Sequence, residues 1–177
     1  NHRKTILYIG KLNNSHTRKS LPTFIEKILP GIIKKFGNDS IVYKVIGSMN
    51  NAEDLIKKYQ NIPCVEFAGF IENLEDEYAK ALCQIVPEGH NTGVRIKIVE
   101  SLSFGLPIIS SKKELMTLGL RDNEGCKVAD DFNDYAKIRI RSYKSSFLGE
   151  VFLGILNLLK KIFRKEQESS KRSIDLR

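Results

Sequence analysis

The feature that most constrains this chain of 177 residues is a regular alternation of short apolar runs with longer amphipathic ones. The short runs are rich in β-branched residues, as buried parallel strands require, and cover 5–9, 41–46, 64–68, 83–86, 107–110 and 126–128. Between them, apolar residues recur at three- and four-residue steps, which predicts helices over 19–36, 52–59, 74–82, 93–104 and 131–138. Helical crossovers of this length return the chain for parallel pairing. The sequence therefore predicts an α/β fold with a Rossmann-like, doubly wound parallel sheet of about six strands.

Two details qualify this outline. Pro30 is expected to kink or split the first helix, because it lacks an amide donor and clashes with the preceding turn. We expect residues 1–140 to form the Rossmann-like domain and residues 141–177 to form an amphipathic helix followed by a basic tail.

The net charge of +8 is concentrated near the end of the sequence. Residues 139–177 contain ten Lys and Arg against four Asp and Glu, which leaves +2 for the first 138 residues. A domain that follows nucleic-acid phosphates carries its basic residues within the fold. The distribution therefore argues against a nucleic-acid partner and suits anionic lipid better.

Cysteine usage and apolar run lengths indicate the compartment. Cys64, Cys83 and Cys126 lie far apart, without a CxxC pair or a histidine at ligand spacing, and are interpreted as reduced core thiols. The sequence opens directly before a strand without a signal peptide, and no apolar run reaches the ~18 residues of a membrane span. We expect a cytoplasmic location.

Glycines follow the predicted strands where ligands of such sheets bind, outside the carboxyl ends of the strands. They are Gly10, Gly47, Gly69, Gly89 and Gly93. Glycine lets backbone amides approach a ligand closely, although a single glycine after a strand more often serves only to form a turn.

The most informative segment is 87–111, which contains a strand end, a glycine loop, a helix start, a second glycine and a strand. Thr92 can cap the helix that begins near Gly93, which leaves the amides of Gly93, Val94 and Arg95 free. These amides and the positive end of the helix dipole form an anion site.

Lys97 and Glu100 are three residues apart and share one face of this helix. A cation there can meet a diphosphate while the carboxylate accepts hydrogen bonds from ribose hydroxyls. The alternative is a surface ion pair worth ~0.3 kcal/mol, and the surrounding glycines favour the nucleotide.

These motifs resemble the donor-binding, C-terminal domain of GT-B glycosyltransferases, specifically the retaining family 4, or group 1. The resemblance covers roughly residues 4–140 and is carried most strongly by VEFAGFIENLEDEYAKA (65–81) and GVRIKIVESLSFGLPIIS (93–110). It implies that Glu100 holds the donor ribose, and that Gly93, Val94 and Lys97 hold the pyrophosphate.

The resemblance extends to other loops. It implies that the backbone of Phe70 and Ile71 meets the nucleobase, and that Lys11, after Gly10, reaches the phosphates. It also implies a second cation, for which both Arg18 and Lys19 remain candidates.

One departure concerns the sugar. Many members carry a glutamate where this chain has Thr92, so the acidic hexose contact is absent. NTGVRIKIVES resembles a subgroup that shares this lack, which assigns the sugar contacts to His90, Asn91 and Thr92. His90 considered alone is more often a solvated loop residue.

No metal or cofactor is expected. The acidic residues Glu72, Glu75, Asp76 and Glu77 stand at the start of a predicted helix, where carboxylates interact favourably with the dipole. The family resemblance likewise implies no divalent ion held by an acidic pair.

The resemblance further implies transfer of a sugar from a UDP- or GDP-linked donor to an acceptor hydroxyl, in bacterial surface polysaccharide or glycolipid synthesis. Acceptor and most catalytic side chains are expected on a missing N-terminal domain, so the chain alone is expected to be inactive. Residues 147–163 are expected to form a helix that packs on that domain. The alternative is an interfacial helix that places the chain peripherally on the inner face of an anionic membrane.

Rival functions are a different nucleotide-dependent Rossmann enzyme, a GT-B-type sugar-nucleotide epimerase, and a non-catalytic, membrane-docking nucleotide-binding module. The first lacks its fingerprint, because YIGKLNNSH follows the first strand in place of GxGxxG and no GxxxxGK[ST] occurs. Product analysis separates the epimerase, and tail-dependent liposome binding without nucleotide binding would favour the docking module.

Overall fold

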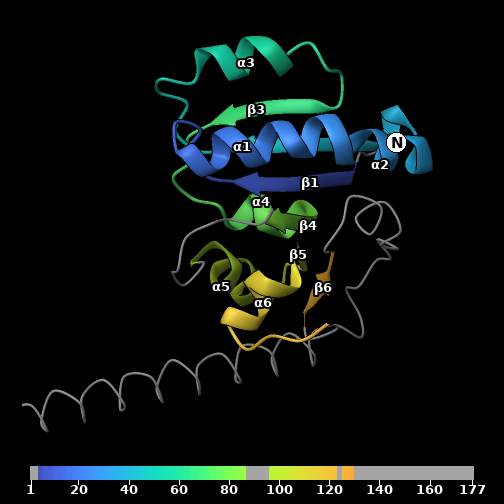
Figure 1. Ribbon diagram of the computed structural model, residues 1–177, viewed down its shortest axis with the longest axis vertical. Coiled ribbons are helices and arrows are strands. Elements are labelled where there is room, and N and C mark those ends of the chain that lie inside the picture. The colour runs from blue at the N-terminus through green and yellow to red at the C-terminus, as the bar shows by residue number, and fades with distance from the viewer. Residues whose placement is uncertain (1–3, 87–95, 123–124, 130–177) are drawn as a thin grey trace, which may run out of the picture.

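The computed structural model describes residues 4–86, 96–122 and 125–129, which fold into an alternating series of strands and helices (Figure 1). The strands are β1 Lys4–Ile9, β2 Ile41–Ile46, β3 Val65–Gly69, β4 Ala81–Val86, β5 Ile108–Ser110 and β6 Cys126–Val128. The helices are α1 Ser15–Thr23, the π-helical turn η1 Phe24–Ile28, α2 Leu29–Phe36, the 3₁₀ turn η2 Asn38–Ser40, α3 Glu53–Tyr59, α4 Glu75–Lys80, α5 Ile96–Ser103 and α6 Lys112–Thr117.

All six strands join one sheet in the order β3-β2-β1-β4-β5-β6, and every pairing is parallel. This is the strand order of Rossmann folds, in which the chain works outward in one direction from β1 and then returns to work outward in the other. The predicted fold class is confirmed. The switch point falls between β1 and β4, and the carboxyl ends of these two strands are where such a sheet binds ligands.

Side-chain alternation along the strands divides the core between the two faces of the sheet. Ile6 and Tyr8 of β1 belong to the largest apolar cluster, which includes Phe24 of η1 and Tyr59 of α3. Leu7 points to the opposite face and packs with Tyr78 of α4. In Figure 1, α1 runs alongside β1 and covers the near face of the sheet, in keeping with this division. Helices therefore cover both faces, as a doubly wound sheet requires.

The first long helix is divided as Pro30 predicted. Leu29 donates its amide to the carbonyl of Phe24, five residues back, which creates the π turn η1. Pro30 then sits in the first turn of α2, where its missing amide leaves no intrahelical bond unmade. The prediction of a split is confirmed, but the helical stretch begins at Ser15 rather than at residue 19.

Two other boundaries were predicted wrongly. Ala81 and Leu82 were assigned to a helix, yet β4 begins at Ala81, which pairs with Thr5. Short apolar runs are ambiguous between helix and strand, and pairing with β1 decides this one. Helix α6 was not predicted, although Ser111 precedes Glu114 at capping-box spacing and its Oγ accepts from the Glu114 amide at 3.3 Å. The predicted helix over 131–138 and the tail after residue 140 lie outside the described residues.

Cys64, Cys83 and Cys126 are buried, and none of the three is in a disulfide, as predicted. Burial raises the pKa of Cys83 to about 12, so its thiol stays protonated and inert. Within the part of the chain that the structure describes, no helix is long and apolar enough to cross a membrane.

Candidate functional site

The loops after β1, β2 and β3 are fastened to one another through their backbones at the carboxyl edge of the sheet. The Gly10 amide donates to the Ile46 carbonyl at 2.9 Å, and the Gly47 amide donates to the Gly69 carbonyl at 2.8 Å. Gly47 has φ of +144°, and a Cβ there would lie 2.1 Å from the Gly10 carbonyl oxygen. Only glycine fits at this position. The glycine after β2 is therefore explained by close backbone approach, without a ligand.

Gly10 differs from Gly47. A Cβ at Gly10 would meet the Thr17 hydroxyl and the Tyr8 ring at 3.5 Å, which is ordinary van der Waals contact. Nothing among the described residues requires glycine at this position. A close-passing ligand would require it, in keeping with the predicted role of Gly10.

Lys97, in the first described turn of α5, reaches the end of β1. Its ammonium donates to the Ile9 carbonyl at 3.3 Å and lies 5.4 Å from the centroid of the Tyr8 ring. Ile9 directly precedes Gly10 and Lys11. The structure thus brings the cation of α5 to the start of the loop that carries the predicted phosphate-binding lysine, at the switch point of the sheet.

Glu100 follows three residues after Lys97 on α5, and both side chains are partly exposed. Ile96, one residue before Lys97, is 74% exposed. The start of the described part of α5 is therefore open, and Glu100 is not turned into the apolar core. On its inner side Glu100 borders Tyr78, since burial first and the charge of Glu100 second raise the pKa of Tyr78 to about 12.

The two predicted base contacts differ in burial. Phe70, directly after β3, is 77% exposed. Ile71 is partly buried against the cluster that contains Tyr78 and Leu7. One side of the Phe70–Ile71 turn is thus anchored on the face of the sheet that α4 covers, while the aromatic ring projects into solvent.

Of the two candidates for a second cation, Arg18 is held by protein groups. Its guanidinium forms a two-pronged ion pair with Asp54 of α3 at 2.8 and 3.0 Å and donates to the Asn51 carbonyl at 2.6 Å. The bond to Asp54 raises the pKa of Arg18 and lowers that of Asp54. Lys11 and Lys19 are exposed. The structure thus shows a protein partner for Arg18, and the assignment of the second cation to Arg18 or to Lys19 stays a prediction.

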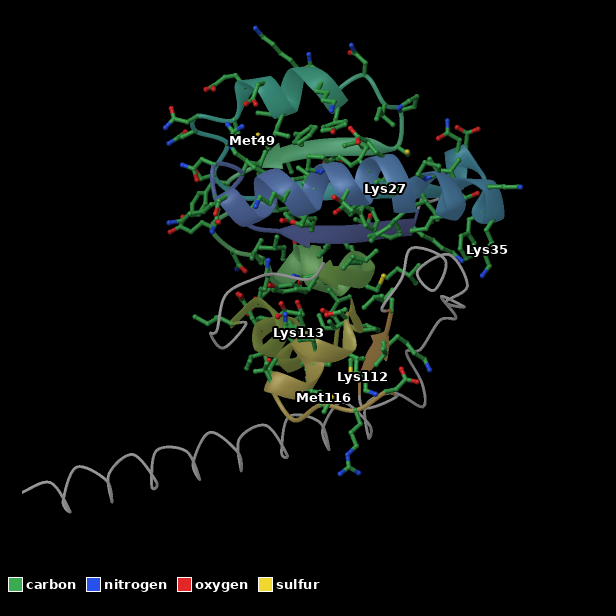
Figure 2. All side chains as sticks on the ribbon, in the orientation of Figure 1. Lys27, Lys35, Met49, Lys112, Lys113 and Met116 are labelled. Atoms are coloured by element: carbon green, nitrogen blue, oxygen red, sulfur yellow. The ribbon has the colours of Figure 1, made fainter. Side chains whose placement is uncertain are left out.

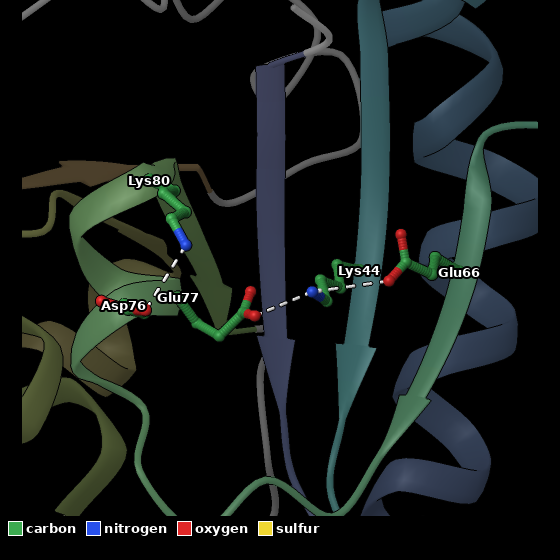
Figure 3. Close-up of polar contacts among 5 residues, drawn as sticks. All are labelled: Lys44, Glu66, Asp76, Glu77 and Lys80. Carbon is green, nitrogen blue, oxygen red and sulfur yellow. Dashed lines mark hydrogen bonds and ion pairs between the residues drawn. The ribbon is translucent and has the colours of Figure 1, made fainter.

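Two acidic residues in the first turn of α4, Asp76 and Glu77, form ion pairs with lysines of the fold (Figure 3). Lys44 of β2 lies between Glu77 at 2.9 Å and Glu66 at 3.4 Å. Burial opposes the charge of Lys44, but the bond to Glu77 and the charge of Glu66 outweigh it and raise its pKa. Asp76 pairs with Lys80 one turn later. Over the described residues, no three His, Cys, Asp or Glu side chains gather as a metal site would require.

The basic side chains of the described residues are spread over the fold. In Figure 2, Lys27 and Lys35 lie by α1 and α2, whereas Lys112 and Lys113 lie by α6. Lys27 of η1 and Lys35 of α2 thus lie apart from Lys112 and Lys113 of α6, whereas a nucleic-acid-binding face would carry its basic residues as one patch.

Five predicted ligand contacts lie outside the described residues: His90, Asn91, Thr92, Gly93 and Val94. Two neighbours of the site were missed from the sequence. Tyr8 supports Lys97 and Tyr78 borders Glu100, but each is remote in sequence from its partner. Tyr8 was predicted only as part of the strand 5–9, and Tyr78 only as part of the helix 74–82. Neither carries a local signal that distinguishes it from an ordinary core tyrosine.

The sequence model of a family described as glycosyl transferases, group 1, matches residues 3–144. A search of curated proteins returns no match.

Solved structures show the same fold. HepE from Anabaena in complex with UDP is 14% identical with a TM-score of 0.66, over 97% of this chain and 49% of HepE. Sucrose-phosphate synthase from Thermosynechococcus elongatus is 17% identical with a TM-score of 0.67, over 98% of this chain and 46% of that one. The catalytic domain of cholesterol-α-glucosyltransferase from Helicobacter pylori is 15% identical with a TM-score of 0.55, over 89% and 99%. This chain therefore spans about half the length of the first two, and it matches the C-terminal halves of GT-B glycosyltransferases.

Proposed function

The chain belongs to the glycosyl transferases of group 1, and we propose that it is the donor-binding domain of a retaining enzyme. The reaction is transfer of a sugar from a nucleotide diphosphate sugar to an acceptor hydroxyl. The position of Lys97 supports this proposal most directly. Its ammonium lies at the carboxyl end of β1, at the switch point of the sheet, with the partly exposed Glu100 three residues further along the same helix.

Each side chain has a role in this proposal. Lys97 and Lys11 bind the diphosphate and stabilise the negative charge that grows on it as the sugar leaves. Glu100 accepts hydrogen bonds from the ribose hydroxyls. Gly93 and Val94, which lie outside the described residues, are proposed to donate their backbone amides to the diphosphate. No metal takes part, because these cations and amides meet the phosphate charge.

The base and the sugar are bound on either side of these groups. The Phe70–Ile71 turn meets the base, with the exposed Phe70 ring available for stacking and Ile71 anchoring the turn. His90, Asn91 and Thr92 contact the sugar. We propose UDP as the nucleotide ahead of GDP, since HepE was solved with UDP and with UDP and glucose.

The acceptor and most catalytic side chains belong to a second α/β domain in this proposal. The chain covers about half of HepE, and the relatives' extra length leaves room for such a domain. Without it the two substrates are not held in register, so binding is expected without transfer. We place the enzyme at the cytoplasmic face of a bacterial membrane, in surface polysaccharide or glycolipid synthesis.

Calorimetry with UDP and GDP on the wild-type chain and on Glu100→Ala tests the proposal. Loss of a hydrogen-bonded charge is expected to weaken UDP binding by about 10- to 100-fold. Glu72→Ala is the matched control, since it removes a carboxylate before α4 and is expected to leave the affinity unchanged. If no nucleotide binds the wild type, or if Glu100→Ala binds every nucleotide undiminished, the proposal is wrong.

A further inference from the structure

Tyr78 of α4 is held rigidly beside the helix that carries the candidate site. Its side chain is 2% exposed and packs with Leu7, Ile46 and Leu106 on one face of the sheet. Its ring stacks on Phe104, with centroids 4.9 Å apart and planes inclined at 19°. The Phe104 amide in turn donates to the Glu100 carbonyl at 3.2 Å. The ring is thus fixed against the turn of chain that runs from Glu100 to Phe104.

The hydroxyl of Tyr78 is a buried donor that finds no hydrogen bond of normal geometry among the described residues. Buried hydroxyl groups nearly always form a hydrogen bond, because a buried group without one has lost its bonds to water and gained none in return. Ser101, the other polar side chain in reach, donates its own proton to Gln84 and can offer Tyr78 only the lone pairs of a neutral hydroxyl. The Glu100 carboxylate is therefore the charged acceptor within reach.

The hydroxyl is also poised to donate. Burial, and after it the negative charge of Glu100, raises the pKa of Tyr78 to about 12, so the group keeps its proton throughout the physiological range. A carboxylate has two oxygens, so Glu100 can accept from Tyr78 on its inner side while its outer side faces solvent.

We propose that Tyr78 is a positioning residue: its buried hydroxyl donates to Glu100 when nucleotide binds and aims the carboxylate at the ribose hydroxyls. This inference deepens the proposed function and rests on it. In the free chain the Tyr78 hydroxyl makes no hydrogen bond of normal geometry to Glu100, although it lies close enough for the Glu100 charge to act on it. On binding, the donor gains its missing partner and the carboxylate loses its freedom to rotate.

Tyr78→Phe tests this inference on the 177-residue chain. The substitution keeps the ring and its stacking on Phe104 and removes a hydroxyl that is unsatisfied in the free chain, so the melting temperature is expected to be unchanged or higher. UDP affinity is nevertheless expected to fall about tenfold, which corresponds to ~1.4 kcal/mol. Tyr59→Phe is the matched control: it removes a tyrosine hydroxyl bonded to Glu26 and is expected to leave UDP affinity unchanged.

A second probe separates positioning from packing. The analogue 2′,3′-dideoxy-UDP lacks both ribose hydroxyls, so Tyr78→Phe is expected to bind it as the wild type does. In the double variant with Glu100→Gln, the Tyr78→Phe effect on UDP is expected to vanish, because the two side chains act through one contact. Equal losses for UDP and the analogue, additive losses in the double variant, or UDP affinity unaltered by Tyr78→Phe would each overturn the inference. The wild type and Glu100 variants would still report separately on the proposed function.

Discussion

The two sides of the seam between β1 and β4 are built differently. On one side, β1 and β2 pair residue by residue from Lys4 and Ile41 to Ile9 and Ile46, and their loops are joined by backbone hydrogen bonds. On the other side, β5 and β6 have three residues each and pair only from Ile108 to Ser110. The β1–β2 side, which we call the fixed side, exposes loop backbone at the ends of its long strands. The β4–β5–β6 side contributes side chains of α5.

This difference indicates how the candidate site is assembled. The loops after β1 and β2 are joined by hydrogen bonds, and their glycines carry no side chain that would cover the backbone. Helix α5 supplies the cation and the carboxylate. Lys97 links the two, because it stands on α5 and donates to the last carbonyl of β1. Tyr78 makes a second link by stacking on Phe104 directly after α5. Ligand affinity should therefore depend on both sides, and fold stability mainly on the first.

The largest effect is expected on the free energy of unfolding of Gly47→Ala, which changes the loop after β2 on the fixed side. Its Cβ would lie 2.1 Å from the Gly10 carbonyl oxygen, and φ of +144° is strained for alanine. Moving backbone to relieve this contact is expected to cost about 3 kcal/mol or more. Urea unfolding measures the loss.

Gly10→Ala is the matched control for that substitution, since its Cβ would meet only ordinary contacts at 3.5 Å. It is expected to change the free energy of unfolding little and, if the diphosphate binds beside Gly10 as proposed, to weaken UDP binding. If Gly47→Ala unfolds at the same urea concentration as the wild type, the close backbone approach of the loops after β1 and β2 does not stabilise the fold as described above.

Lys97→Met removes the hydrogen bond that joins α5 to the end of β1. Methionine keeps an unbranched apolar stem and removes the charge and the bond to Ile9. Losing a charge-assisted contact to phosphate is expected to weaken UDP binding by roughly 10- to 100-fold. Lys112→Met on α6 serves as the control for a general loss of positive charge. Equal affinities for both variants would remove Lys97 from the site.

Much of the fixed side was predictable from the sequence, and the links across the seam were not. The β-branched run before Gly10 predicts a buried strand, and the three-residue spacing predicts that Lys97 and Glu100 share a helix face. The contacts of Lys97 with Ile9 and of Tyr78 with Phe104 depend on which elements become neighbours. Local periodicity carries no such information, and a tyrosine that borders a site looks like any core tyrosine.

Arg18 shows the same limit from the opposite direction. Its place in the loop region after β1 makes it a candidate phosphate cation, yet tertiary packing brings Asp54 and the Asn51 carbonyl to its guanidinium. Helix α6 is a different case, because the Ser111 and Glu114 capping pair was readable and went unused.

A smaller effect is expected from Ser111→Ala, which tests the side with short strands. The Ser111 side chain caps α6 at 3.3 Å, and its loss is expected to cost ~0.5–1 kcal/mol. Thermal unfolding measures the shift, and Ser111→Asp, which retains a capping oxygen, is expected to restore most of it. UDP affinity should not change, since α6 lies away from the seam; a loss of affinity would show that the two sides are coupled more widely than through α5.

The smallest effect is expected from Asp54→Asn, which removes one half of the ion pair with Arg18. The bond to Arg18 lowers the pKa of Asp54, so its stabilising contribution is present above the ordinary aspartate pKa of about 3.9 and is lost as pH falls through the lower folded value. Wild type should therefore lose more melting temperature than Asp54→Asn between pH 5 and pH 3. The pair is exposed and screened by solvent, so the difference should be smaller than the Ser111→Ala effect and should shrink further in high salt. A large, salt-insensitive difference in melting temperature would mean that this ion pair stabilises the fixed side as much as its strands and glycines do.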